Sequence, residues 1–198
     1  MKFQAIRVGL VVFVALWFFI FAAARAESAP TFNKLLIAPK GSTPPKDFSF
    51  PDLEGKIRKL SEMQGKVVLL TFFATWCPLC NEEMPKLTRL YEKFKDRGLV
   101  VLAVSIDRAP ASFVRLWTRN KKLTYPILHD QKYSVRRTHN VRFVPTIYVL
   151  DRDLQLAGWT IGQVDWNGKK ATDLIERLLK APPSSARAGS GKKTARLP

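Results

Sequence analysis

Two long apolar runs dominate the middle of the chain. The first is "KVVLLTFF" (residues 66–73), the second is "LVVLAVSI" (residues 99–106), and neither alternates with polar residues. A strand without such alternation is buried on both faces, as in the centre of a parallel sheet. Between the runs, apolar residues recur every three or four positions, which is typical of one face of a helix. They are Cys80, Met84, Leu87, Tyr91 and Phe94. The pattern predicts a strand–helix–strand unit with a right-handed crossover.

Shorter patterns extend this unit in both directions. Upstream, "FSFPDLEGKIRKL" (residues 48–60) predicts two short strands around a turn. Downstream, "SFVRLW" predicts a helix, and "TIYVL" and "LQLAGWT" predict two strands. A last helical stripe comprises Ala171, Leu174, Ile175, Leu178 and Leu179. This order predicts an α/β fold with a mixed central sheet flanked by helices, preceded by an N-terminal β-hairpin extension.

The N-terminus has the layout of an export signal. Lys2 and Arg7 precede an uncharged apolar run over residues 8–24, and the small residues of "ARA" end at Ala26. A secretory signal peptide cleaved after Ala26 has this layout. The run also reaches the length of the shortest transmembrane helices, ~17 residues. Residues 1–26 are therefore interpreted as a signal peptide or a membrane anchor. Both interpretations place the rest of the chain in the periplasm or on the outer face of the cytoplasmic membrane.

Composition divides the remainder into three parts. Residues 27–45 are rich in proline and small polar residues and are predicted to be a linker. Residues 46–180 carry the strand and helix patterns and form the predicted domain. Residues 181–198 combine proline, serine, glycine and basic side chains, with too little apolar surface to order themselves, and are predicted to be a disordered basic tail.

The chain is strongly basic, with 33 Lys and Arg against 16 Asp and Glu and a net charge of +17. These charges are scattered, and the sequence has neither zinc-finger spacing nor an aromatic RNA-binding signature. We therefore expect no nucleic-acid partner. A solvated basic surface near an anionic one, such as a membrane, accounts for the charge.

The two cysteines of the chain, Cys77 and Cys80, lie in "TFFATWCPLC". A disulfide closing so small a loop would remove little entropy from the unfolded chain, and structural zinc needs four ligands. Redox chemistry remains. Cys77 precedes the predicted helix, whose free N–H groups and dipole favour a thiolate, and Pro78 suits the first turn. Cys80 belongs to the apolar stripe. We therefore expect Cys77 to attack a substrate disulfide and Cys80 to release the product.

Several stretches together carry a family resemblance. They are "DLEGK", "VVLLTFFATWCPLCNEEMPKL", "PILHD" and "NVRFVPTIYVLDRD". The chain resembles the TlpA/ResA/CcmG-like thiol–disulfide oxidoreductases of the thioredoxin superfamily. The resemblance implies a thioredoxin fold and an exported protein disulfide reductase that acts on client cysteines, including those of apocytochrome c. It also implies that a transmembrane thiol donor resets the pair.

The same resemblance implies roles for residues around the cysteines. The Val144–Pro145 peptide bond should be cis and face the pair, and Trp76, Pro78, Val144 and Pro145 should form the substrate groove. Thioredoxin itself has a buried aspartate six residues before the first cysteine, where this chain has Thr71. Members of this branch carry a functional glutamate three residues after the second cysteine. Glu83 is therefore the candidate acid/base for Cys80, and Glu82 is expected to be solvated.

Two other functions on related folds were compared with this one. A copper-delivery module has three residues between its cysteines and a distal histidine ligand, whereas the spacing here is two, and it stays the alternative function. A peroxidase needs a threonine three residues before its reactive cysteine, where this chain has Ala74. His129 and His139 match no standard metal spacing, so we expect neither a metal nor a cofactor. The uncharged Pro78 and Leu79 between the cysteines favour a reducing pair.

Overall fold

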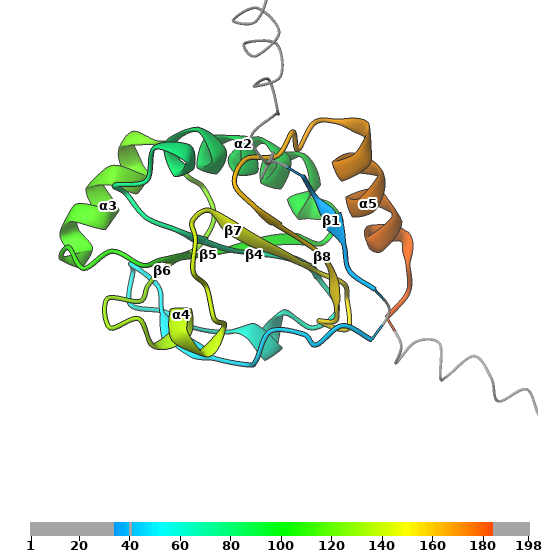
Figure 1. Cartoon of the computed structure of the whole chain (residues 1–198), viewed down its shortest axis with the longest axis horizontal. Helices are drawn as coiled ribbons and strands as arrows, with labels where there is room; N and C mark the ends of the chain where they lie inside the picture. Colours follow the sequence, from blue (N-terminus) through cyan, green and yellow to red (C-terminus); the bar gives the residue numbers. More distant parts are fainter. Residues whose placement is uncertain (1–33, 40, 184–198) are drawn as a thin grey trace, which may run out of the picture. The chain divides into compact units, whose positions relative to one another are not determined.

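The computed structural model describes residues 34–39 and 41–183 (Figure 1). The predicted signal peptide or anchor at 1–26 and most of the predicted tail lie outside these residues. Within the described part, no helix combines the length and the apolar character needed to cross a membrane.

The centre of the fold is a mixed six-stranded sheet with the strand order β1-β8-β7-β4-β5-β6. Its strands are β1 (Leu36–Ile37), β4 (Val67–Phe73), β5 (Leu99–Ser105), β6 (Ile127–His129), β7 (Thr146–Leu150) and β8 (Leu156–Ile161). β4, β5 and β6 run parallel, whereas β7 is antiparallel to β4, and β8 to β7. Every residue of β4 is buried, because strands and helices cover it on all sides. The predicted mixed sheet with central parallel strands is confirmed.

Helices cover both faces of the sheet. They are α2 (Pro78–Phe94), α3 (Ala111–Asn120), α4 (Ser134–Thr138) and α5 (Lys169–Lys180), with the 3₁₀ segments η1 (Leu60–Met63) and η2 (Lys95–Arg97). Figure 1 shows α2, α3 and α5 along one side of the sheet and α4 on the other. The two consecutive parallel crossovers, through α2 and α3, place these helices on the same face.

The predicted N-terminal hairpin is also confirmed. β2 (Ser49–Pro51) and β3 (Ile57–Lys59) pair in antiparallel register. Asp52 closes the turn by accepting the backbone N–H of Lys56 at 2.8 Å and the Arg58 Nε–H at 2.8 Å. An isolated bridge from Asp52 to Leu128 of β6 joins the hairpin to the edge of the main sheet.

Part of the predicted linker belongs to the sheet instead. Leu36 and Ile37 form β1 and pair with Trp159 and Gly158 of β8. Leu35 beside them is buried. The prediction of a linker over 27–45 was therefore wrong at this point. Two residues in a proline-rich segment are too few to show a strand periodicity. Backbone pairing with an edge strand orders the segment, and such pairing leaves no trace in the sequence pattern.

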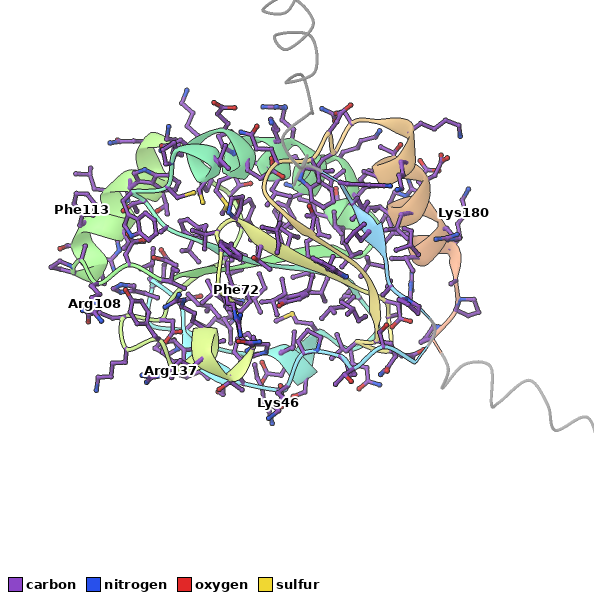
Figure 2. The ribbon with its side chains drawn as sticks, in the orientation of Figure 1. Lys46, Phe72, Arg108, Phe113, Arg137 and Lys180 are labelled. Atoms are coloured by element: carbon purple, nitrogen blue, oxygen red, sulfur yellow. The ribbon has the colours of Figure 1, made fainter. Side chains whose placement is uncertain are left out.

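Two other elements have no counterpart among the predicted ones. β6 has three residues and α4 has five, which is too short for either period to be visible. They nevertheless matter for the site, because together they carry the chain from β5 back across the sheet to β7. Figure 2 shows side chains filling the space between the sheet and its helices, with Phe72 of β4 in the interior.

Candidate active site

Cys77 occupies the N-cap of α2, as predicted. Its backbone is extended, Pro78 takes the first helical position, and the Cys77 Sγ accepts the backbone N–H of Cys80 at 3.2 Å. This is the arrangement in which a side chain satisfies a free N–H of the first turn. Cys77 thus lies at the positive end of the helix dipole, beside the N–H groups of the first turn.

Cys80 lies one turn further along and is fully buried, whereas Cys77 keeps 4% of its surface exposed. Both are free thiols in this structure. Burial raises the pKa of the Cys80 thiol far above its ordinary value, and the hydrogen bond with the Cys77 side chain raises it further. The two sulfurs therefore differ in their surroundings: Cys77 keeps a small exposed fraction, whereas Cys80 is fully enclosed and its thiol has a raised pKa.

The loop before β7 faces this pair. The Val144–Pro145 peptide bond is cis, as the resemblance implied, and the Cys77 thiol donates to the Val144 carbonyl at 3.4 Å. Within the described residues, the Val144 N–H has no hydrogen-bond partner. An extended client segment beside Cys77 could therefore bond to this N–H in the manner of an added strand.

A cavity of about 450 Å³ opens at Cys77. Its lining comprises Trp76, Cys77, Pro78, Leu79, Ile106, Tyr133, Arg136, Arg142, Phe143 and Val144. Three of the four predicted groove residues thus line it, and Pro145 is buried next to Val144. Trp76 is 65% exposed. Its indole therefore belongs to the rim of the cavity and not to the core. We call this cavity the Cys77 groove.

Glu83 is fully buried on the inner side of α2. Its Oε1 accepts the Trp166 Nε1–H at 2.6 Å and the backbone N–H of Val164 at 3.1 Å. Its Oε2 has no hydrogen bond within the described residues and lies 3.7 Å from the Lys86 Nζ. Burial raises the pKa of Glu83, although the Trp166 bond opposes this shift. The exposed, helix-dipole role is thus excluded for Glu83, whereas Glu82 is exposed as expected.

A second buried carboxylate, Asp107, has no counterpart among the site residues predicted from the sequence. It accepts the backbone N–H of Thr75 at 3.0 Å, the Thr75 hydroxyl at 2.6 Å and the Ser105 hydroxyl at 2.6 Å. Thr75 is two residues before Cys77, so Asp107 ties the end of β5 to the loop that carries the reactive thiol. Its negative charge also contributes to the raised pKa of Cys80. Polar residues directly after a buried parallel strand were the available signal, since such strand ends gather functional groups.

The other residues considered in the sequence are Thr71 and the two histidines. Thr71 is buried in β4, and its hydroxyl has no partner within the described residues. The His129 Nε2 faces the Asp107 carbonyl at 2.9 Å, and the two ring nitrogens of His139 face the carbonyls of Val135 and Lys46. Both imidazoles are therefore engaged with the backbone. Within the described ranges, no group of three or more His, Cys, Asp or Glu is placed to hold a metal ion.

Comparison with known proteins identifies the family. The AhpC/TSA family profile matches residues 42–158, more than half of the chain. The chain belongs to the AhpC/TSA family. The matched range includes the hairpin, the cysteine pair and the cis-proline loop.

Two relatives bear the name thiol-disulfide oxidoreductase ResA. The protein from Geobacillus kaustophilus is 38% identical over 113 residues, which cover 57% of this chain and 64% of that protein, slightly less than two thirds of its length. The protein from Bacillus thuringiensis subsp. konkukian is 31% identical over 134 residues, which cover 68% of this chain and 73% of that protein.

A solved structure from Chlorobium tepidum, described as a candidate DsbE thiol:disulfide interchange protein, superposes with a TM-score of 0.63. It is 26% identical and covers 69% of this chain and 95% of its own. The resemblance to the ResA and CcmG-like branch is therefore confirmed, and so is the thioredoxin fold. The described part of the chain is a thioredoxin-like redox enzyme domain of the thiol–disulfide oxidoreductase type.

Proposed function

We propose that this protein is an exported protein disulfide reductase that acts on cysteines of other exported proteins. The observation that supports it most strongly is the difference between the two thiols. Cys77 caps α2 and opens into the Cys77 groove, whereas Cys80 is enclosed and has a raised pKa. One thiol is placed to meet a client, and the other can react only with Cys77.

The reaction follows from this arrangement. The Cys77 thiolate attacks one sulfur of a client disulfide, which forms a mixed disulfide and releases the other client sulfur as a thiolate. The Cys80 sulfur, after losing its proton, then attacks the Cys77 Sγ. The Cys77–Cys80 disulfide forms, the mixed disulfide breaks, and the client leaves with both of its sulfurs reduced. Two electrons pass from the cysteine pair to the client.

The second step needs a proton acceptor, because burial keeps Cys80 protonated at neutral pH. Glu83 is three residues after Cys80 on the same helix, and its Oε2 has no hydrogen bond within the described residues. Its pKa is raised by burial, so it can exchange a proton closer to neutral pH than an exposed glutamate can. We assign Glu83 the role of acid/base for Cys80.

The direction of electron flow rests on the residues between the cysteines. Pro78 and Leu79 carry no charge that would stabilise the thiolate further. The stronger the stabilisation of the reduced form, the more oxidising is the pair. A reducing pair in an exported protein needs a thiol donor that brings electrons across the membrane. The clients we propose are exported proteins whose cysteines must be reduced, with apocytochrome c among them.

A redox titration of the full-length chain tests the direction. After equilibration in glutathione buffers, the fraction of Cys77–Cys80 disulfide gives the reduction potential. We expect a value near that of thioredoxin, about −270 mV, and well below that of DsbA, about −120 mV. In cells, thiol trapping should find the pair mainly reduced. A potential near the DsbA value, with an oxidised pair in cells, would make the protein a disulfide donor instead.

Location is tested separately by fractionation and intact-mass analysis. A species that starts at Glu27 in the soluble exported fraction would identify a cleaved signal peptide, and full-length mass in membranes would identify an anchor. Recovery of the protein from the cytoplasm would contradict export.

A further inference from the structure

Two arginines line the Cys77 groove, and a third contacts a residue of its lining. Arg136 of α4 and Arg142 of the loop before β7 line the groove together with Cys77. The guanidinium of Arg108 lies 5.0 Å from the centre of the Tyr133 ring, which also lines it. Figure 2 shows Arg108 at the edge of the molecule, shortly before α3 begins at Ala111.

These arginines have no acidic partner within the described residues. The ion pairs of that part of the chain involve other cations. The two aspartates nearby in the sequence are engaged elsewhere. Asp107 binds Thr75 and Ser105, and Asp130 accepts the backbone N–H groups of Ser134 and Arg136. Within the described residues, therefore, none of the three guanidinium groups forms an ion pair.

One of these arginines is held in a fixed position. The Arg136 Nε–H donates to the Val141 carbonyl at 3.1 Å, and its guanidinium lies 5.0 Å from the centre of the Tyr133 ring. Its two terminal amino groups have no hydrogen bond within the described residues. A planar guanidinium with two free donors matches the geometry of a carboxylate. Because the side chain is already immobilised, a carboxylate that binds here loses less entropy to ordering.

The rim of the groove is aromatic as well as basic. Trp76 is 65% exposed and Phe143 is 60% exposed, and both line the groove beside Arg142. The surface that a client segment meets at Cys77 thus combines apolar contact area with unpaired positive charge.

We propose that the Cys77 groove selects client segments in which aspartate or glutamate flanks the reacting cysteine. This specificity rests on the proposed reductase function. Arg136 and Arg142 bind the flanking carboxylates, and Trp76 and Phe143 contact the apolar residues of the same segment. In an extended client, residues two apart are about 7 Å apart on one side of the chain. One bound cysteine can therefore present neighbouring acidic residues to both arginines.

The test uses the reduced full-length protein and three synthetic peptides with one internal disulfide each. The peptides are identical except that glutamate, glutamine or lysine occupies the positions two residues before and two residues after the first cysteine. The second-order rate constant of the first exchange step is measured at low salt. We expect the glutamate peptide to react about tenfold faster than the lysine peptide, with the glutamine peptide between them. The preference should shrink as ionic strength rises.

A matched pair of variants separates the groove from the overall charge of the protein. Arg142→Gln, alone and with Arg136→Gln, should reduce the preference for glutamate several-fold. Arg137→Gln removes the same charge from the neighbouring position of α4, and Arg137 does not line the groove. It should leave the preference unchanged. Arg142 makes no hydrogen bond or ion pair within the described part of the chain, so its variant tests recognition without disturbing the fold.

The outcomes distinguish the two proposals. Equal rates for all three peptides would overturn the specificity while leaving the reductase function intact. If Arg137→Gln reduces the preference for glutamate as much as Arg142→Gln does, the preference arises from the net charge of the protein. That result would also overturn the proposed specificity of the groove. Failure of the protein to reduce even the glutamine peptide would contradict the proposed function itself.

Discussion

The two ends of the Cys-x-x-Cys turn lie in opposite surroundings. In front, Cys77 faces a groove with an exposed tryptophan and with two arginines that form no ion pair in the described part of the chain, and Asp107 fixes the loop before Cys77 through Thr75. Behind, Cys80 is enclosed, and the carboxylate of Glu83 on the same helix is held by the loop after β8. We call these regions the front and the back of the pair.

The two buried carboxylates, Asp107 in front and Glu83 behind, differ in how many of their oxygens accept hydrogen bonds. Both oxygens of Asp107 accept hydrogen bonds, so its charge is well solvated by the protein and its role is to hold the loop in place. Within the described residues, one oxygen of Glu83 accepts hydrogen bonds and the other does not, and burial raises the pKa of Glu83. A fully satisfied carboxylate positions its partners, whereas a partly satisfied one is suited to proton exchange. In the proposed mechanism, the front therefore binds and orients the client, and the back supplies the proton chemistry.

Replacing each cysteine in turn by serine is the strongest test of the difference between the front and the back of the pair. We expect Cys77→Ser to abolish exchange, with a loss of at least about 1,000-fold, because the nucleophile is removed. Cys80→Ser should accumulate mixed disulfides with client proteins, since the resolving sulfur is absent. Trapping is measured by non-reducing electrophoresis and mass spectrometry. Equal trapping by both variants would show that the two thiols are interchangeable and that the division is wrong.

Asp107→Asn tests the front. An amide in place of the carboxylate presents a donor to the Thr75 and Ser105 donors, so at least one bond is lost, at a cost of about 1–3 kcal/mol in the free energy of unfolding. We expect the first exchange step to slow about tenfold. Because the negative charge of Asp107 helps to raise the pKa of Cys80, that pKa should fall in the variant.

Urea unfolding, stopped-flow kinetics of the first step and a thiol titration of Cys80 measure these effects. Asp96→Asn is the control, since Asp96 is exposed on η2. A variant that loses stability but keeps the wild-type rate and Cys80 pKa would reduce Asp107 to a structural residue.

Glu83→Gln tests the back through its pH dependence. Burial raises the pKa of Glu83 in the folded protein, so the folded state favours the protonated carboxyl. As the pH falls from the folded pKa to the unfolded one, the wild type gains stability relative to the variant, which has no such proton to bind. At neutral pH the variant should turn over several-fold more slowly, because the acid/base for Cys80 is gone, and its pH–rate profile should lose one transition.

Glu82→Gln is the control for this experiment, because Glu82 is the adjacent, exposed residue of the same helix. Denaturant unfolding across the acid range and turnover against pH are the two measurements. If the profiles of Glu83→Gln and the wild type coincide, the carboxylate serves only to join α2 to the loop after β8.

The back of the pair was the easier region to predict from the sequence. Cys80 and Met84 belong to one helical stripe, and the apolar runs that became β4 and β5 enclose it, so the burial of Cys80 follows from local periodicity. The partner of Glu83 was not predictable in this way. Trp166 lies 83 residues further along the chain and reaches Glu83 only because β8 brings its loop back to α2.

The front depends on such long-range contacts throughout. Asp107 meets Thr75 because β4 and β5 end at the same edge of the sheet. Arg136 and Arg142 reach the groove through β6 and α4, which are too short to be recognised by periodicity. Sequence patterns therefore located the cysteine pair and the layers around it, whereas the side chains that shape the groove could be assigned only once the fold was known.

The smallest effect is expected from Trp166→Phe, which keeps an aromatic ring at the back but removes the indole N–H. In the wild type the Trp166 hydrogen bond lowers the pKa of Glu83 against the larger effect of burial. Without it, Glu83 Oε1 retains the backbone N–H of Val164, and the pKa of Glu83 should rise further. The transition in the pH–rate profile should move to higher pH, while turnover at the optimum changes by less than about threefold. Trp159→Phe is the matched control, since the Trp159 indole on β8 donates no hydrogen bond within the described residues. If the pH–rate profile shifts equally in both variants, or in neither, the Glu83–Trp166 hydrogen bond does not set the proton chemistry at the back of the pair.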